Sequence, residues 1–207
     1  MSHQSNDNPQ AQDVSNVANL IAITGLNLAL SYENAAVDRL EKRLSESIVP
    51  EGKEKLKRHL DQTRGQQERL KERIKALGGG VGMEPISEKG HLPIPQPPQR
   101  LKIMIESRSS DKEREVWESL NDLIVERAES IMYKGGIQAL ELLKADKKTI
   151  KALGKNLKEE EAFGDWLEKN NPKIAKRLMT RQMQEKKGKK KTMQEEKEEE
   201  AVSATAA

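Results

Sequence analysis

The sequence predicts an all-α protein, a bundle of four helices in which two helical hairpins are joined by a long crossover loop. Apolar residues recur at steps of three and four in four separate segments, which is the spacing of one helix face. Aromatic residues make up only 2% of the 207 residues, which disfavours a β-sandwich. A Gly/Pro-rich stretch at residues 78–110 divides the four segments into two pairs.

Composition narrows the class of protein further. The chain is 34% hydrophobic and 34% charged, which suits amphipathic helices with solvated outer faces. It has no cysteine, so disulfides, zinc fingers, iron–sulfur clusters and cysteine nucleophiles are excluded. The net charge of +3 is too small to select a partner. No phosphate-binding loop, dinucleotide fingerprint or nucleophile elbow occurs.

The first helix is expected at residues 15–47, after a polar tail at residues 1–13 that we expect to be disordered. The apolar segment from Val17 to Leu30 is shorter than the roughly 18–20 residues that span a bilayer. It follows an acidic start rather than the basic region of a secretory signal. We therefore expect a soluble, cytoplasmic protein with no membrane partner. The predicted core face is Leu26, Leu30, Glu33, Val37, Leu40 and Leu44.

The second helix is expected at residues 54–77, between a turn marked by Pro50 and Gly52 and the three glycines that begin at Gly78. Its core face is interrupted by polar side chains at His59, Thr63 and Gln66. The loop at 78–110 holds five glycines and five of the eight prolines. So long an irregular segment inside a compact domain is explained if it crosses from one hairpin to the other.

The third and fourth helices are expected at residues 111–143 and 148–169, and the bundle as a whole at 14–178. Asn170, Asn171 and Pro172 are expected to interrupt the fourth helix. From residue 179 to 207 the chain is charged or small, and we expect a disordered tail. The two core faces have the same step pattern, Leu123, Glu126, Ser130, Tyr133, Ile137 and Leu140 on one and Ile150, Leu153, Leu157, Glu160, Gly164 and Leu167 on the other.

Polar residues near the middle of all four core faces predict a metal site inside the bundle. A lone ionised carboxylate in an apolar core is so costly that it must be protonated, paired or bound to a cation. Counting residues from each hairpin turn places Glu33 level with Gln66, and Glu126 roughly level with Glu160. Oxygen ligands with at most one imidazole favour iron or manganese. The candidate ligands are Glu33, His59, Gln62, Gln66, Glu126, Glu129, Glu160, Glu161 and Asp165.

Less specific explanations compete with a metal site. A glutamate on a helical stripe is more often solvated at the helix edge, and His59 lies in a basic stretch where an exposed histidine is ordinary. A buried polar layer can also set register and dimerisation with no metal. A lysine cluster in the tail could contact nucleic acid, although an acidic run follows it directly. That cluster is Lys186, Lys187, Lys189, Lys190 and Lys191.

Four segments carry a resemblance to a known family: ALSYENAAVDRLEKRL, HLDQTRGQQERLKERIKALGG, VERAESIMYKGGIQAL and NLKEEEAFGDWLEKNNPKI. Over about residues 17–178 the chain resembles the YciE/YciF family of ferritin-like proteins, nearer the YciE branch. The resemblance implies a ferritin-like four-helix bundle, commonly dimeric, with a suspected di-iron-type site and a link to stress responses.

The resemblance also implies roles for residues of this chain. Glu33, Glu126 and Glu160 would ligate or bridge two irons, with His59 or Gln66 completing the shell. Oxygen or peroxide would react there, and Tyr133 would be a nearby redox or hydrogen-bonding group. The chain departs from the family pattern at Gln62, where relatives often have glutamate, and by having no histidine on its fourth helix. A weaker, single-ion or vestigial site is consistent with these departures.

Overall fold

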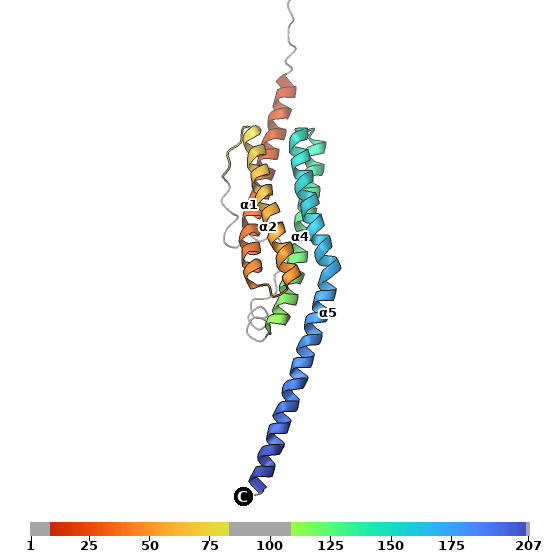
Figure 1. Ribbon diagram of the computed structural model, residues 1–207. Helices are drawn as coiled ribbons and strands as arrows, with labels where there is room; N and C mark the ends of the chain where they lie inside the picture. Colours follow the sequence, from red (N-terminus) through yellow and green to blue (C-terminus); the bar gives the residue numbers. More distant parts are fainter. Residues whose placement is uncertain (1–8, 83–108, 206–207) are drawn as a thin grey trace, which may run out of the picture.

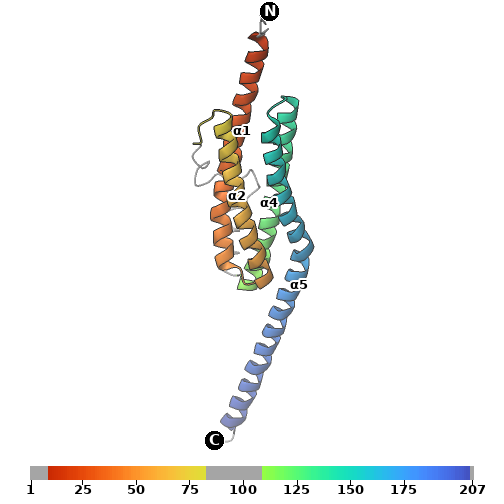
Figure 2. The same ribbon diagram turned by 45° about the horizontal axis from the view of Figure 1, so that its top comes forward.

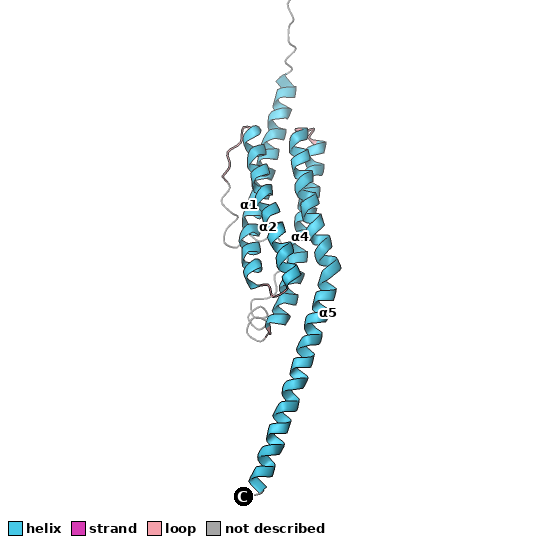
Figure 3. Cartoon of the chain, viewed as in Figure 1, coloured by secondary structure: helices cyan, strands magenta, loops and turns pink. Residues whose placement is uncertain are grey.

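The computed structural model describes residues 9–82 and 109–205. Within these ranges the chain forms helices and connecting turns with no β-strand (Figure 3). The predicted all-α four-helix bundle is confirmed. The helices are α1 (Pro9–Glu46), α2 (Pro50–Ala76), α4 (Asp111–Leu142) and α5 (Lys147–Thr205).

The helices form two antiparallel hairpins, α1 with α2 and α4 with α5, which pack side by side through α2 against α5 and α1 against α4. Figures 1 and 2 show that α2 ends at one end of the bundle and that α4 begins at the other. The end of α2 and the start of α4 therefore lie at opposite ends of the bundle. Most of the predicted loop, residues 83–108, lies outside the described residues.

Local signals in the sequence define the helix ends. Pro50 occupies the first turn of α2, where its missing N–H has no partner to lose. Gly78 adopts a φ of 80° just after α2, the left-handed conformation that glycine adopts most easily. Ser110 and Glu113 form a reciprocal capping box at the start of α4. Asp146 caps α5 by accepting a hydrogen bond from the backbone N–H of Thr149 at 2.8 Å.

Two apolar clusters lie on either side of a polar layer, and a third, of Val49, Ile174 and Leu178, lies near the start of α2. The cluster nearer the end of α2 contains Ala22, Leu26, Ala29, Leu30, Leu70, Ile74, Tyr133, Leu140 and Leu153. The cluster nearer the start of α2 contains Leu40, Leu56, Leu60, Phe163 and Leu167. The apolar members of the predicted core faces accordingly point inward.

Three helix boundaries differ from the predicted ones by more than one residue. α1 begins at Pro9 instead of residue 15, and α2 begins at Pro50 instead of residue 54. α5 continues through Pro172 to Thr205, where an interruption and then a disordered tail were predicted. Asn171 is bonded across the interface to the backbone carbonyl of Ser119 at 2.7 Å, which holds α5 against α4 at this point. Figures 1 and 2 show α5 bending where it leaves the bundle, as expected for a helix containing proline.

Among the described helices, only α1 is long and apolar enough over Asn16–Glu46 to cross a bilayer by length and composition. The uncharged segment of this helix begins before Val17. The apolar segment predicted from the sequence, Val17 to Leu30, was therefore too short. In the bundle, α1 buries Leu26, Leu30 and Leu40 against the other helices. It therefore packs as a core helix of this fold.

Candidate metal centre

The polar layer receives side chains from all four helices. α1 provides Glu33, α2 provides His59 and Gln66, α4 provides Glu126 and Glu129, and α5 provides Glu160; each is at most 3% exposed. The four interruptions predicted to share one level are therefore buried together. The carboxylates act on one another's pKa values, so their mutual geometry determines which charges the layer can hold.

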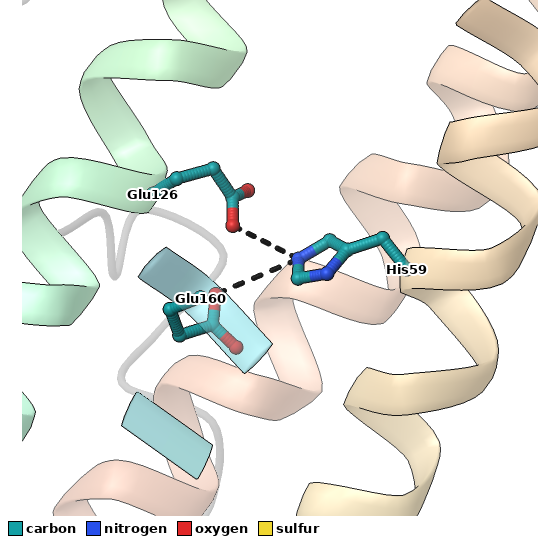
Figure 4. Close-up of side chains that lie close together, drawn as sticks. All are labelled: His59, Glu126 and Glu160. Atoms are coloured by element: carbon teal, nitrogen blue, oxygen red, sulfur yellow. Dashed lines mark ion pairs between the residues drawn. The ribbon is translucent and has the colours of Figure 1, made fainter. Parts of the chain in front are cut away.

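His59, Glu126 and Glu160 make the tightest group (Figure 4). The Nε2 atom of His59 lies 2.9 Å from Oε2 of Glu126 and 3.5 Å from Oε2 of Glu160. The three potential ligand atoms lie within 4.8 Å of one another. The ring of Phe163 stacks on the His59 imidazole at a centroid distance of 4.2 Å, which holds the plane of the imidazole. Two carboxylates and one imidazole thus converge from three helices.

Each of the two carboxylates has one oxygen held by the protein and one left without a hydrogen bond. Oε1 of Glu126 accepts from Arg39 Nη2 at 2.9 Å, and Oε1 of Glu160 accepts from the side-chain amide of Gln66. Oε2 of Glu126 and Oε2 of Glu160 have no hydrogen-bond partner among the described residues, although His59 Nε2 lies near both. Leaving such atoms unpaired costs about 1–3 kcal/mol each.

The unpaired atoms fit a cation. Both Oε2 atoms face His59 Nε2, so an ion among the three atoms would satisfy two orphaned oxygens and one imidazole lone pair at once. The donor set contains no sulfur, which favours iron, manganese or zinc over soft metals. The residues present therefore suit the metal that the sequence predicted.

Glu33 and Glu129 extend the layer beyond this group. The hydroxyl of Tyr133 donates to Oε1 of Glu33 and accepts from Asn156 Nδ2, at 3.0 Å for the latter bond. Burial raises the pKa of Glu33 well above its usual value, and Glu129 raises it further. Glu33 is therefore neutral or bound to a cation near neutral pH.

The pKa values of the remaining carboxylates differ because their neighbours differ. Burial, together with the charge of Glu126, raises the pKa of Glu129 to about 8 and that of Glu160 well above its usual value. Burial would also raise the pKa of Glu126, but the contact with His59 and the charge of Arg39 outweigh it and lower that pKa to about 2. One ionised carboxylate among protonated ones is how the layer balances its charge without a metal.

A chain of ion pairs leads away from Glu126 along the α1–α4 interface. Arg39 binds Asp122 at 2.7 Å as well as Glu126, and Arg43 binds the other oxygen of Asp122 at 2.9 Å. Arg43 also contacts Glu115 at 3.2 Å. Sequence reasoning missed Arg39 and Asp122 as supports of the site. Their signal was present, because Asp122 lies four residues before Glu126 on the same helix face.

Three predicted ligands lie outside the cluster. Glu161 pairs with Lys134 at 2.7 Å, and Asp165 pairs with Arg127 at 2.8 Å on the outer side of α4 and α5. Gln62 is half-buried on α2 and makes none of the described contacts to the layer. Neighbouring side chains on a helix point about 100° apart, so Glu161 lies on a different face of α5 from Glu160.

Comparison with known proteins supports the fold alone. No protein-family profile and no curated protein match the sequence. A crystal structure of a protein from Xanthomonas campestris is similar with a TM-score of 0.63 and 16% identity, covering 80% of this chain and 99% of that one. YcfI of Rhodopseudomonas palustris, a suspected structural protein, is similar with a TM-score of 0.58 and 23% identity, covering 80% and 98%.

Proposed function

We propose that this protein binds a metal ion between α2, α4 and α5, with His59, Glu126 and Glu160 as ligands. The observation that supports this most directly is the pair of buried carboxylate oxygens that face His59 Nε2 without a hydrogen bond. Helical bundles of this type hold metals with carboxylates and histidines projected inward from facing helices. Iron and manganese suit this set of ligands.

A second ion is part of the proposal. Glu33 and Glu129 are buried beside the first group, and their carboxylates repel the others unless protons or a cation intervene. They supply the further carboxylates that a di-iron-type site needs. Gln66, whose Oε1 has no hydrogen-bond partner, is a neutral ligand available to either ion.

The proposed role is oxidative chemistry in a cytoplasmic stress response, in line with the resemblance to the YciE/YciF family. A bound iron would supply one-electron chemistry with oxygen or peroxide. The chain would orient the ligands through Arg39 and Gln66 and exclude bulk water with the two apolar clusters. Tyr133 would hold its proton on the hydrogen bond to Glu33, because burial raises the pKa of its hydroxyl well above the usual value.

Metal content tests the proposal. Protein purified without chelator and loaded with ferrous iron in the absence of oxygen should carry about one or two ions per chain by mass spectrometry of the elements. Glu126→Gln and Glu160→Gln should each reduce that content at least tenfold, since each removes a charged ligand but keeps the side-chain shape. Glu161→Gln is the matched control, because Glu161 lies outside the cluster. Equal metal content in all four proteins would contradict the proposal.

The alternative is a non-enzymatic interaction module with a polar layer in place of a metal site. The observation that favours it is that protonated Glu33, Glu129 and Glu160 balance the layer without a cation. If this alternative is correct, neither chelator nor added iron should change the melting temperature. If the chain holds a metal centre, the melting temperature should rise with metal concentration, because only the folded chain brings the ligands together.

A further inference from the structure

A line of hydrogen bonds joins one side chain from each of the four helices beside the polar layer. Its members are Arg69 of α2, Asn156 of α5, Tyr133 of α4 and Glu33 of α1. Nε of Arg69 donates to Oδ1 of Asn156 at 2.7 Å, and Nδ2 of Asn156 donates to the Tyr133 hydroxyl at 3.0 Å. The hydroxyl donates in turn to Oε1 of Glu33. We call these four residues the hydrogen-bond line.

The chemistry of arginine sets the direction of every bond in the hydrogen-bond line. A guanidinium group has only N–H donors and does not lose its proton in proteins. The amide of Asn156 must therefore turn its oxygen to Arg69, which leaves its NH₂ group facing Tyr133. An NH₂ group only donates, so the Tyr133 hydroxyl accepts from it and has its one proton left for Glu33.

Arg69 is itself held in place at the edge of the bundle. Its Nη2 atom pairs with Glu159 of α5, and the two side chains are 19% and 16% exposed. Asn156, Tyr133 and Glu33 are at most 2% exposed, so bulk water has little access to their hydrogen bonds. A fixed donor at one end and burial along the rest leave the line with a single arrangement of protons.

Glu33 needs such a line because of the kind of group that donates to it. Glu126 and Glu160 also have Oε1 held by a donor of the protein, which is a guanidinium group for one and an amide for the other. The donor to Glu33 is a hydroxyl, which turns about its C–O bond and can accept as well as donate. A further residue must therefore direct the Tyr133 proton.

We propose that Arg69 and Asn156 are positioning residues, which direct the Tyr133 proton to Glu33 and so orient the Glu33 carboxylate for a cation. Arg69 takes up no further proton, so the line holds the hydroxyl proton in place and does not conduct protons out of the bundle. The role toward a cation rests on the second ion of the proposed function. The direction of the hydrogen bonds does not, because the four side chains alone determine it.

Vibrational spectroscopy of the metal-free protein tests the direction of the bonds. The chain has two tyrosines, so Tyr32→Phe leaves Tyr133 as the only one. The C–O stretching band of a tyrosine that both donates and accepts differs from the band of one that only donates. Asn156→Asp replaces the NH₂ group with an oxygen, so Tyr133 should lose the bond that it accepts and its band should shift. An unshifted band would mean that Asn156 already turns its oxygen to Tyr133, which would overturn the proposal.

Substitutions of arginine test whether Arg69 sets that direction. Arg69→Met removes the donor, so the Asn156 amide can turn over and the band should move toward that of Asn156→Asp. Arg69→Lys keeps a group that only donates and should retain the unmodified band. Arg64→Met is the matched control, because Arg64 lies on the same helix, is 50% exposed and pairs with the exposed Glu41. Equal bands for Arg69→Met and Arg64→Met would show that Arg69 does not direct the proton.

Manganese binding tests the consequence for a cation. Asn156→Leu is of similar size and adds no charge, so it removes the direction of the Tyr133 proton without attracting the ion. Loss of a residue that orients a ligand typically weakens metal binding about 10–100-fold. Titration with manganous chloride should show that loss for the ion that Glu33 holds, while the ion that His59 holds should bind as before. Equal affinities in both proteins would overturn the role toward a cation. If the unmodified protein binds no manganese, the proposed function fails, and the Tyr133 band still decides the direction of the bonds.

Discussion

Glutamates of identical chemistry behave differently in the polar layer because each has different neighbours. Glu126 contacts Arg39 and His59, which lower its pKa to about 2 despite complete burial. Glu129, one helical turn away, has no such direct contact among the described ones, and its pKa rises to about 8. The layer thus contains both a carboxylate that stays ionised and carboxylates that hold protons near neutral pH.

This difference predicts how the stability of the metal-free protein depends on pH. The pKa of Glu129 rises from 4.5 to about 8 on folding, so the folded protein binds more protons than the unfolded chain between those values. The free energy of unfolding that Glu129 contributes is then fully present below pH 4.5 and is lost as pH rises through 8.

The measurement is urea unfolding of the chelated protein from pH 5 to pH 9, with Glu129→Gln beside it. The difference in the free energy of unfolding between the unmodified protein and the variant should shrink as pH rises, because glutamine does not titrate. Parallel pH profiles for the two proteins would show that Glu129 titrates normally in the fold. Added metal should flatten the profile of the unmodified protein, since a cation replaces the protons.

At this scale the sequence predicted the inward-facing residues well. Glu33, Glu126 and Glu160 were expected inside because each lies in step with apolar neighbours, and all three are buried. The pattern could not predict that Gln66 holds Glu160, or that Asn156 holds Tyr133, because those contacts join different helices. Periodicity gives the face of one helix, whereas a hydrogen bond between helices depends on how the helices are rotated against each other.

Among the helices, α1 and α4 are joined mainly by charge. Arg39 and Arg43 on α1 alternate with Glu126, Asp122 and Glu115 on α4 along their contact. These charges are well paired, so their burial costs less than isolated charges would. Specific pairing of this kind also fixes how far one helix slides along the other.

Removal of Arg43 should therefore be strongly destabilising. Its side chain is 5% exposed, and Arg43→Ala leaves Asp122 and Glu115 buried without that cation, which costs about 3–5 kcal/mol. Lys42→Ala, at a 73% exposed neighbour on the same helix, should change stability by less than about 0.5 kcal/mol. Urea unfolding of both variants measures the difference. A loss below about 1 kcal/mol for Arg43→Ala would show that water compensates the two carboxylates.

Helix ends were predicted correctly where capping residues mark them. The end of α5 was missed because a helix-breaking residue is followed by residues that favour a helix. Ser110 with Glu113, and the glycine at Gly78, gave the start of α4 and the end of α2 closely. Pro172 and the charged run after it suggested an end to α5, but residues with good helix propensity follow Pro172, and helix continues through them. Proline removes one backbone hydrogen bond, and the contact of Asn171 with α4 compensates for part of that loss.

At the scale of the whole molecule, α5 projects beyond the bundle after Glu185, whose carboxylate still pairs with Lys112 of α4. The last buried apolar residue of α5 is Leu178, and from Met183 through Lys190 its side chains are exposed. Figure 1 shows this part of α5 extending away from the other helices. It adds helix to the molecule without adding to the core.

Truncation after Glu185 should therefore leave the bundle intact. We expect the melting temperature to change by less than about 2 °C, because no core contact is lost. Circular dichroism should show fewer helical residues, and the sedimentation coefficient should be higher relative to the mass. A large drop in melting temperature would mean that the projecting helix folds back on the bundle or on another chain.

The overall architecture followed from periodicity and loop length alone. Four apolar faces and one long Gly/Pro segment allow few arrangements, and a crossover between two hairpins was among them. The exposure of Leu120, Ile124 and Ile131 on α4 was not predicted, because apolar residues at these positions do not by themselves show which face meets the core. Only the rotation of α4 within the bundle separates one face from the other.

The polar layer is shared between the two hairpins, since His59 comes from the first and Glu126 and Glu160 come from the second. Neither hairpin alone contains that set of three ligands, so the set exists only while the hairpins are docked. An ion at this position would resist their separation, and the hairpins would have to part for it to leave quickly. The residence time of the ion and the opening rate of the bundle would then be two measures of the same motion.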